Sequence, residues 1–204
     1  MGMEPETTVR KVIWKACHNL EKQEKTWNKT LEGSSEHVGS LCNLCEQLQC
    51  CQRVNVEGTP LRSFTDIKDR LQYKLVHSLE IVIAKLKECL DVLQNVWKGV
   101  HNQYNRCIET YHKHAGQLGL EKALERSATE PSIAEMLEWL CDIDRAFTQQ
   151  YTKRKLLLDL VQYDNQEYME NLSKQWMDSG NLNDLIGNAL AHVSFFMADA
   201  DYTS

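Results

Sequence analysis

The chain has 204 residues, of which 42% are hydrophobic and 25% charged, and its formal net charge is −6 at pH 7. This composition is typical of a globular protein, and the negative charge argues against general nucleic-acid binding, which needs a basic surface. No run approaches the roughly 18 apolar residues of a membrane-spanning helix, and the charged N-terminus does not look like a signal peptide. We therefore expect an intracellular protein whose eight cysteines stay reduced.

Apolar residues recur with helical spacing along the whole chain, and no stretch alternates as a β-strand would. The first apolar stripe predicts a helix over about 8–31. The Gly-Ser-Ser triplet at 33–35 should break it, because these residues weaken a helix interior, and the loop at 55–60 ends the second helix. Residues of about 8–55 are therefore expected to form a helical hairpin.

The next predicted helix is long and covers about 66–114. Its apolar residues recur every seven positions, the spacing of long helices that pack along one another: Leu79, Leu86, Leu93 and Val100. A second apolar flank, which includes Trp97, widens the stripe, so this helix should pack against at least two others. Gly116 and Gly119 are expected to end it.

Further helices are predicted over about 132–197. Ser132 and, three residues later, Glu135 have the spacing of a capping box and mark the first of them. One apolar face of that helix should lie in the core, and it carries Leu137, Leu140, Ile143 and Phe147. The chain is thus predicted to form a single all-α domain over 1–204, an elongated bundle of long amphipathic helices with coiled-coil-like packing.

Four cysteines lie close together in SLCNLCEQLQCC: Cys42, Cys45, Cys50 and Cys51. One interpretation is a helical-bundle metal-binding or thiol protein, because paired cysteines are typical zinc ligands. However, Cys50 and Cys51 would point about 100° apart on a helix. Cys45 and Cys51 also fall on the apolar stripe, where a free cysteine packs as a small hydrophobe. Core packing is the preferred interpretation, and no metal or other cofactor is expected.

No motif typical of an enzyme is present. The sequence contains neither a phosphate-binding loop nor a GxSxG or HExxH pattern. Glu109 and His112 form one Glu-x-x-His pair, whereas a di-iron bundle needs two such pairs and two further glutamates. The chain is therefore predicted not to be an enzyme.

The densest basic cluster is Lys153-Arg154-Lys155, inside the helix that begins near Ser132. Such a cluster is either simply solvated or a contact for an acidic partner surface. We expect all three side chains to face solvent in the isolated protein, because a core needs no charges. The cluster is thus a candidate partner-binding site.

Two stretches resemble a known family: PSIAEMLEWLCDIDRAFTQQYTKRKLLL at 131–158 and HVSFFMADAD at 192–201. They are similar to the AIRIM family of ribosome maturation factors, with which the length and the helix order also agree. The cysteine-rich stretch resembles the family too, but the family has alanine at several of these cysteine positions. That difference favours packing over metal binding, because alanine cannot replace a metal ligand.

The resemblance implies a non-catalytic adaptor subunit of an AAA ATPase complex of the Afg-two, spermatogenesis-associated type. The implied partners are a heterohexamer of two related ATPases, the helical protein CINP and, indirectly, the pre-60S ribosomal particle. The implied work is late cytoplasmic maturation of the large (60S) ribosomal subunit, with a further role in replisome proteostasis in the nucleus. Neither a membrane nor a specific nucleic-acid sequence would be bound directly. The candidate partner-binding residues are Trp139, Lys153, Arg154, Lys155, Phe195 and Trp97.

Overall fold

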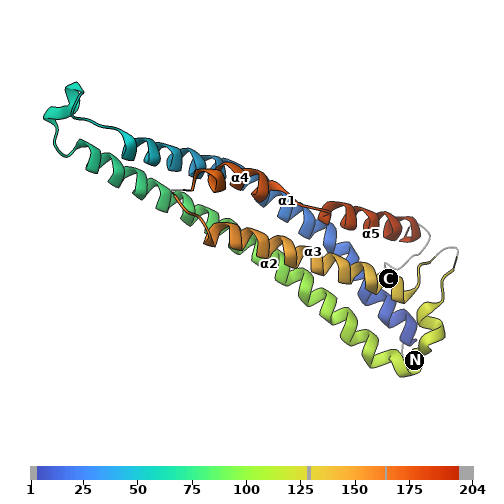
Figure 1. Cartoon of the computed structure of the whole chain (residues 1–204). Coiled ribbons are helices and arrows are strands. Elements are labelled where there is room, and N and C mark those ends of the chain that lie inside the picture. Colours follow the sequence, from blue (N-terminus) through green and yellow to red (C-terminus); the bar gives the residue numbers. More distant parts are fainter. Residues whose placement is uncertain (1–3, 128–129, 164, 198–204) are drawn as a thin grey trace. The chain divides into compact units, whose positions relative to one another are not determined.

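The computed structural model describes residues 4–127, 130–163 and 165–197. Their elements, in chain order, are α1 (Pro5–Arg53), the short 3-10 helix η1 (Pro60–Ser63), α2 (Ile67–Leu124), α3 (Ile133–Asp159), α4 (Gln166–Met177) and α5 (Leu182–Met197) (Figure 1). These described ranges contain no strand, so the predicted all-α fold is confirmed. None of their helices is both long and apolar enough to cross a membrane.

Helix α1 continues without interruption through the break predicted at 33–35. Ser34 is fully buried there, and its Oγ donates a hydrogen bond to the carbonyl oxygen of Leu31, 2.7 Å away. The same Oγ accepts a hydrogen bond from Nε1 of Trp176 at 2.8 Å. A serine whose hydroxyl bonds the preceding turn fits inside a helix, and packing can outweigh a weak local propensity. The predicted break was wrong.

Helix α2 also runs past one of its two predicted ends. Gly116 lies inside the helix, which continues to the buried Leu118. A glycine in a helix interior costs only about 1 kcal/mol, which flanking contacts can offset. Gly119 has φ 76° and ψ 158°, a conformation open to glycine because it lacks Cβ, and the helix kinks at this residue. The prediction holds for Gly119 and was wrong for Gly116.

The chain divides into two compact units, each built from segments distant in sequence. Unit 1 comprises Met1–Asn28, Gln94–Tyr151 and Ser179–Ser204, and unit 2 comprises Lys29–Leu93 and Thr152–Asp178. Three of the four divisions fall inside α1, α2 and α3, where no loop marks them, and the fourth lies between α4 and α5. No boundary is visible in the sequence at the three divisions inside helices, because apolar periodicity continues across them.

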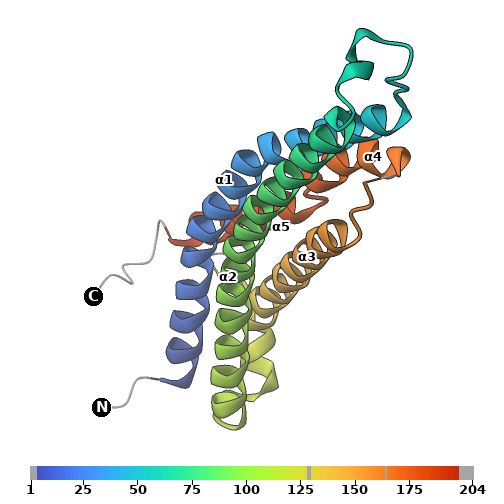
Figure 2. The same cartoon turned by 90° about the vertical axis from the view of Figure 1, so that its left-hand side faces the viewer.

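The core of unit 1 forms where α1, α2 and α3 meet. Figure 2 shows α1 and α2 running side by side. Trp27 of α1 packs edge-on against Phe147 of α3, with ring centroids 5.1 Å apart and an interplanar angle of 86°, an arrangement that aromatic pairs favour. The buried residues include the expected Val100, Leu137, Leu140, Ile143 and Phe147.

Unit 2 buries a second apolar cluster on α1, α2 and α4. Leu79, Leu86 and Leu93, the heptad-spaced leucines of α2, are at most 1% exposed. Trp176 of α4 is equally buried. Its indole N–H donates a hydrogen bond to Oγ of Ser34, so burying this large ring leaves its donor satisfied. Both units thus use the apolar stripes that the sequence shows.

Candidate functional site

The basic cluster of α3 does not face solvent as expected. Arg154 is completely buried, and only Lys155 is exposed. Lys153 is half-buried, and its Nζ lies 2.6 Å from Oδ2 of Asp178. Arg154 is buried because it falls on the side of α3 that carries the buried Leu157 and Leu158. The prediction that all three basic side chains face solvent was wrong for Arg154, which is buried.

Lys153 and Arg154 instead bind the C-terminal end of α4. Asp178 is the residue that caps this helix, and its carbonyl oxygen accepts hydrogen bonds from Nζ of Lys153 at 3.4 Å and from Nη2 of Arg154 at 3.3 Å. Cations at a helix C-terminus are stabilised by the helix dipole. Burial lowers the pKa of Arg154 to about 10, and the charge of Asp178 offsets part of that effect. Arg154 therefore stays charged at neutral pH, and these two residues hold α3 to α4.

A ladder of polar and aromatic side chains joins α2 to α3 within unit 1. The pairs are regularly spaced along the two helices: Gln94 with Tyr151, Trp97 with Thr148, His101 with Asp144, and Tyr104 with Cys141. The two numbers of every pair add to 245, as expected for antiparallel helices in one fixed register. We call these eight residues the α2–α3 ladder.

Trp97 is the centre of the ladder. Its Nε1 donates a hydrogen bond to Oγ1 of Thr148 at 2.9 Å, and its ring stacks on Tyr151 with centroids 5.1 Å apart and an interplanar angle of 5°. The His101 ring also stacks on the indole, with centroids 6.1 Å apart. The indole is only half-buried, so Trp97 contacts α3 and also exposes part of its ring to solvent.

The remaining steps of the ladder are electrostatic. Nδ1 of His101 lies 3.1 Å from the Asp144 carboxylate, whose side chain is mostly buried. Tyr104 is hydrogen-bonded to Cys141, and that bond, together with burial, raises the pKa of Tyr104 to about 12. In the sequence, Trp97 falls on an apolar flank and is a candidate partner-binding residue, whereas Asp144 belongs to no recognised motif. Matching spacings of three and four residues on the two helices were the signal available to find the ladder.

Trp139 lies at a surface pocket between α3 and α5. Its ring is half-buried and tilts against that of His192, with centroids 5.0 Å apart. Asp142, Leu185 and Asn188 complete much of the lining. The side chain of the other aromatic candidate in this region, Phe195, lies outside the described residues. The structure therefore brings Trp139 to an accessible position but does not group it with Lys153, Arg154 and Lys155.

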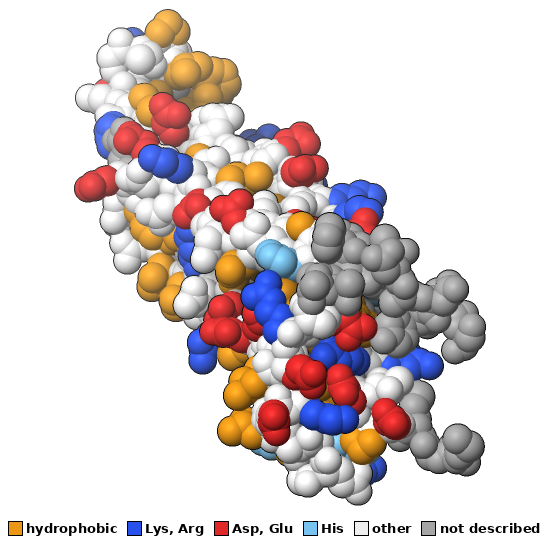
Figure 3. Space-filling model, turned by 90° about the vertical axis from the view of Figure 1, so that its right-hand side faces the viewer, with side chains coloured by type: hydrophobic (Ala, Val, Ile, Leu, Met, Phe, Trp, Pro, Cys, Tyr) orange, Lys and Arg blue, Asp and Glu red, His pale blue; other side chains and the backbone are white. Residues whose placement is uncertain are grey.

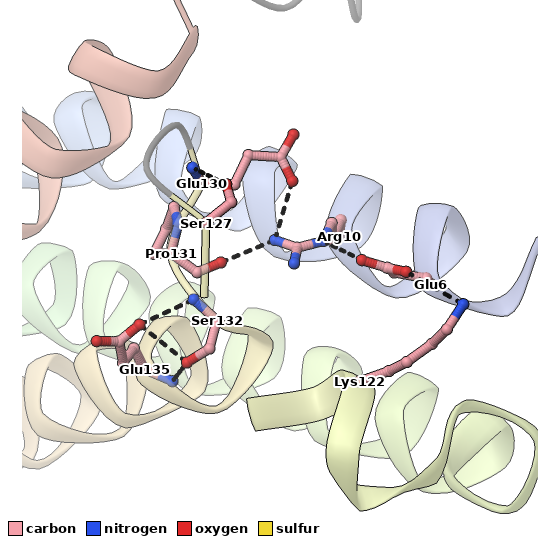
Figure 4. A network of polar contacts seen from close by, with 8 residues as sticks. All are labelled: Glu6, Arg10, Lys122, Ser127, Glu130, Pro131, Ser132 and Glu135. Carbon is pink, nitrogen blue, oxygen red and sulfur yellow. Dashed lines mark hydrogen bonds and ion pairs between the residues drawn. The ribbon is translucent and has the colours of Figure 1, made fainter. Parts of the chain in front are cut away.

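The predicted capping box at the start of α3 is confirmed (Figure 4). Oε2 of Glu135 accepts a hydrogen bond from the backbone N–H of Ser132 at 2.8 Å, and the N–H of Glu135 donates to Oγ of Ser132 at 3.1 Å. The hydrogen bonds from Ser132 and the nearby charge of Arg126, 3.0 Å from Oε1, lower the pKa of Glu135. The box thus fixes where α3 begins.

An arginine of α1 holds the segment that leads into this box. Nη1 of Arg10 donates a hydrogen bond to the carbonyl oxygen of Pro131 at 2.9 Å and lies 3.6 Å from the Glu130 carboxylate (Figure 4). Nε of Arg10 pairs with Glu6 at 3.0 Å, and Glu6 also lies 3.9 Å from Nζ of Lys122. The network is structural, because each charge in it faces a partner within unit 1.

The cysteine stretch lies along unbroken α1, and its side chains point in different directions. Cys45 and Cys51 are buried and Cys50 is exposed. Cys42 donates a hydrogen bond from Sγ to the carbonyl oxygen of Met169 on α4, 3.2 Å away. Burial raises the pKa of Cys45 to about 11, so this thiol is protonated at neutral pH. Within the described ranges, no three His, Cys, Asp or Glu side chains are grouped to hold a metal ion.

Large apolar side chains are exposed where α1 leads into α2. Val54, Leu61, Phe64, Leu71 and Tyr73 are between 46% and 74% exposed. Figure 3 shows hydrophobic side chains gathered at the top of the view, over this connection. We call these five residues the apolar tip. Exposed apolar patches on a folded protein are typical of binding surfaces.

These features define a class: an all-α protein with large apolar side chains exposed on its surface. Residues 7–195 match the family described as "Ribosome biogenesis protein C1orf109-like". The chain is similar to the "AFG2-interacting ribosome maturation factor" of Homo sapiens, with 36% identity over 198 residues covering 96% of this chain and 98% of the relative. The proteins of that name from Mus musculus (34% identity, 96% and 92% covered) and Xenopus tropicalis (36%, 93% and 94%) are similarly related.

The chain therefore belongs to the C1orf109-like family of ribosome biogenesis proteins, and the resemblance seen in the sequence is confirmed. The match extends over nearly all of both units. Family membership, rather than any single motif, thus carries the step from fold to function.

Proposed function

We propose that this protein is a non-catalytic adaptor that links an AFG2-type AAA ATPase to maturation of the large ribosomal subunit. The observation that carries the proposal is the near full-length similarity to relatives named AFG2-interacting ribosome maturation factor. An adaptor of this kind binds the ATPase and its substrate, and the ATPase supplies the energy of nucleotide hydrolysis. In the proposed complex, this chain pairs with CINP, and the pair binds a heterohexamer of two related ATPases. The complex acts on the pre-60S particle in the cytoplasm and in replisome proteostasis in the nucleus.

The apolar tip supports a role in binding proteins. Phe64 is 59% exposed and Tyr73 is 74% exposed, and such side chains gain free energy when a partner covers them, at about 25 cal/mol per Å² of apolar surface. The connection is also held in place: Nζ of Lys68 donates hydrogen bonds to the carbonyl oxygens of Gln52 and Val54, at 2.9 and 3.0 Å. An apolar surface on a fixed backbone binds with less loss of entropy than a free loop.

A reconstitution experiment tests the proposal. The purified chain, mixed with the AFG2-type ATPase and CINP, should co-elute with them and change ATP turnover or substrate release. The variant Leu61→Ser/Phe64→Ser should weaken this assembly, whereas the matched control Leu120→Ser/Leu124→Ser, at exposed leucines of unit 1, should not. If the parent chain neither binds nor alters the ATPase, the adaptor proposal is wrong. If only the control variant loses binding, the apolar tip is not the contact.

A further inference from the structure

A pocket between α1 and α2 in unit 1 is basic, although the protein as a whole is acidic. Its rim carries the cations Lys11 and Lys15 from α1 and Arg106 from α2, and its lining contains no carboxylate. The formal charge of the chain is −6. Three cations around one pocket on such a chain are therefore a local departure from its average charge.

In the described part of the chain, no carboxylate forms an ion pair with Lys11, Lys15 or Arg106. The neighbouring Arg10 is the contrast, because it contacts Glu6, Glu130 and the carbonyl oxygen of Pro131. The adjacent residues Arg10 and Lys11 of α1 thus differ: Arg10 forms contacts within the protein, whereas the charge of Lys11 is exposed to solvent. All three rim residues are exposed.

The floor of the pocket is apolar and carries one unsatisfied acceptor. Val12 and Ala16 lie between the cations, and Sγ of Cys107 contacts the carbonyl oxygen of Val12 at 3.8 Å, so the two helices are close there. Gln103 lines the pocket, and its buried Oε1 has no hydrogen-bond partner among the described residues. A buried acceptor without a partner is unfavourable.

We infer that this pocket is a docking site for an acidic amphipathic helix of a partner protein. Lys11 and Lys15 are one helical turn apart, so carboxylates one turn apart on the partner could face both. The apolar stripe of the same helix would cover Val12 and Ala16. Arg106, on the opposite wall, pairs with a further carboxylate. We call this site the basic groove.

The chemistry of the groove favours a protein helix over RNA. An apolar floor contributes nothing to binding a phosphate backbone, and the lining offers no aromatic ring on which a base could stack. The contact is smaller than a stable interface, which buries about 800 Å² on each partner. It therefore adds to binding elsewhere on the chain, as a second attachment point does.

A peptide assay on the full-length chain tests the inference. The probe is a fluorescent helical peptide of about 18 residues, or five turns, with a leucine stripe flanked by glutamates one turn apart. Its control has glutamine in place of every glutamate. Binding of the acidic peptide should be the tighter of the two and should weaken with added salt. Equal binding of both peptides would overturn the inference.

Charge-reversal variants locate the site. Lys11→Glu/Lys15→Glu and, separately, Arg106→Glu should raise the Kd of the acidic peptide about tenfold or more, as expected for lost charge pairs at an interface. The control Lys85→Glu/Lys87→Glu, at exposed lysines of unit 2, changes the net charge as much as Lys11→Glu/Lys15→Glu does and should leave the Kd within about twofold. Unchanged thermal midpoints exclude unfolding as the cause. Peptide binding that these groove variants do not weaken would contradict the assignment.

Two further measurements separate the other possible occupants. A single-stranded RNA oligonucleotide that bound more tightly than the peptide, and was lost in Lys11→Glu/Lys15→Glu, would replace the protein helix with RNA. Self-association in sedimentation, abolished by the same variant, would assign the groove to a second copy of the chain. The inference rests on the proposed function only in expecting a protein partner. The assay contains no ATPase, so its failure leaves the reconstitution test standing.

Discussion

Trp176 and Ser34, which are 142 positions apart in the sequence, form a buried hydrogen bond of 2.8 Å between Nε1 and Oγ. This contact explains why α1 passes through a triplet that favours a break, because the serine hydroxyl serves both its own helix and the indole of α4. Replacing Ser34 should therefore disturb more than local helix propensity.

Ser34→Ala should lower the free energy of unfolding by about 1–3 kcal/mol, since it leaves the buried Trp176 N–H without its acceptor. The neighbouring Ser35 is exposed, and Ser35→Ala should change stability by less than about 0.5 kcal/mol. Denaturant unfolding of both variants, followed by circular dichroism, makes the comparison. Equal effects at the two positions would show that the indole does not depend on Ser34.

The basic cluster of α3 should respond residue by residue rather than as a unit. Arg154→Ala removes a buried side chain and its hydrogen bond to the end of α4, and we expect a loss of about 2–3 kcal/mol. Lys155→Ala, at an exposed position, should be nearly neutral. Thermal melting measures both. A stable Arg154→Ala protein would show that the contacts of Lys153 and the apolar contacts of α4 hold this helix without Arg154.

Stability in acid should depend on the capping box. Hydrogen bonds from Ser132 hold the pKa of Glu135 below its ordinary value of 4.5. A carboxylate with a lowered pKa stabilises the fold fully above its unfolded pKa, and loses that contribution as the pH falls through the folded value. The thermal midpoints of the parent and Glu135→Gln should therefore differ at neutral pH and converge in acid.

The control for this measurement is Glu138→Gln, at an exposed glutamate on the same helix. It should follow the parent curve at every pH. A gap between parent and Glu135→Gln that stays constant below pH 4.5 would mean that the charge of Glu135 does not contribute.

Thiol reactivity should distinguish the cysteines of α1. The thiolate is the reactive form, and burial raises the pKa of Cys17 to about 12 and that of Cys45 to about 11. Cys50 is exposed. A disulfide reagent should therefore label Cys50 first in the native protein, and Cys50→Ser should remove the fast phase. Labelling of Cys45 at the rate of Cys50 would contradict its buried position.

The periodic features of the sequence predicted the helices and their buried faces. The heptad leucines of α2 and the capping box at Ser132 are local patterns, and the structure has both. The break at 33–35 could not be judged locally, because the hydroxyl of Ser34 is used by a residue on α4. Helix propensity describes an isolated helix, whereas here a contact with a distant residue determines that α1 continues through 33–35.

Candidate-site residues were harder to place than core residues. Whether Arg154 points to solvent depends on its angle on α3 and on where α4 ends, and neither is visible in a run of three basic residues. The basic groove could not be seen in the sequence either, since Lys15 and Arg106 are 91 positions apart and come together only because α1 lies beside α2. To predict a surface that two helices form together, the register of both helices must be known.

The α2–α3 ladder has a consequence for how these positions can change among relatives. Because its four pairs share one register, an insertion or deletion of a single residue in α2 or α3 would rotate every later rung out of contact, by about 100°. A substitution at Trp97 likewise removes the partner of Thr148 and the stacking surface of Tyr151. The two helices should therefore keep equal lengths between the first and last rungs. Opposite positions should covary as pairs, a pattern that an alignment of many sequences would show as four parallel couplings.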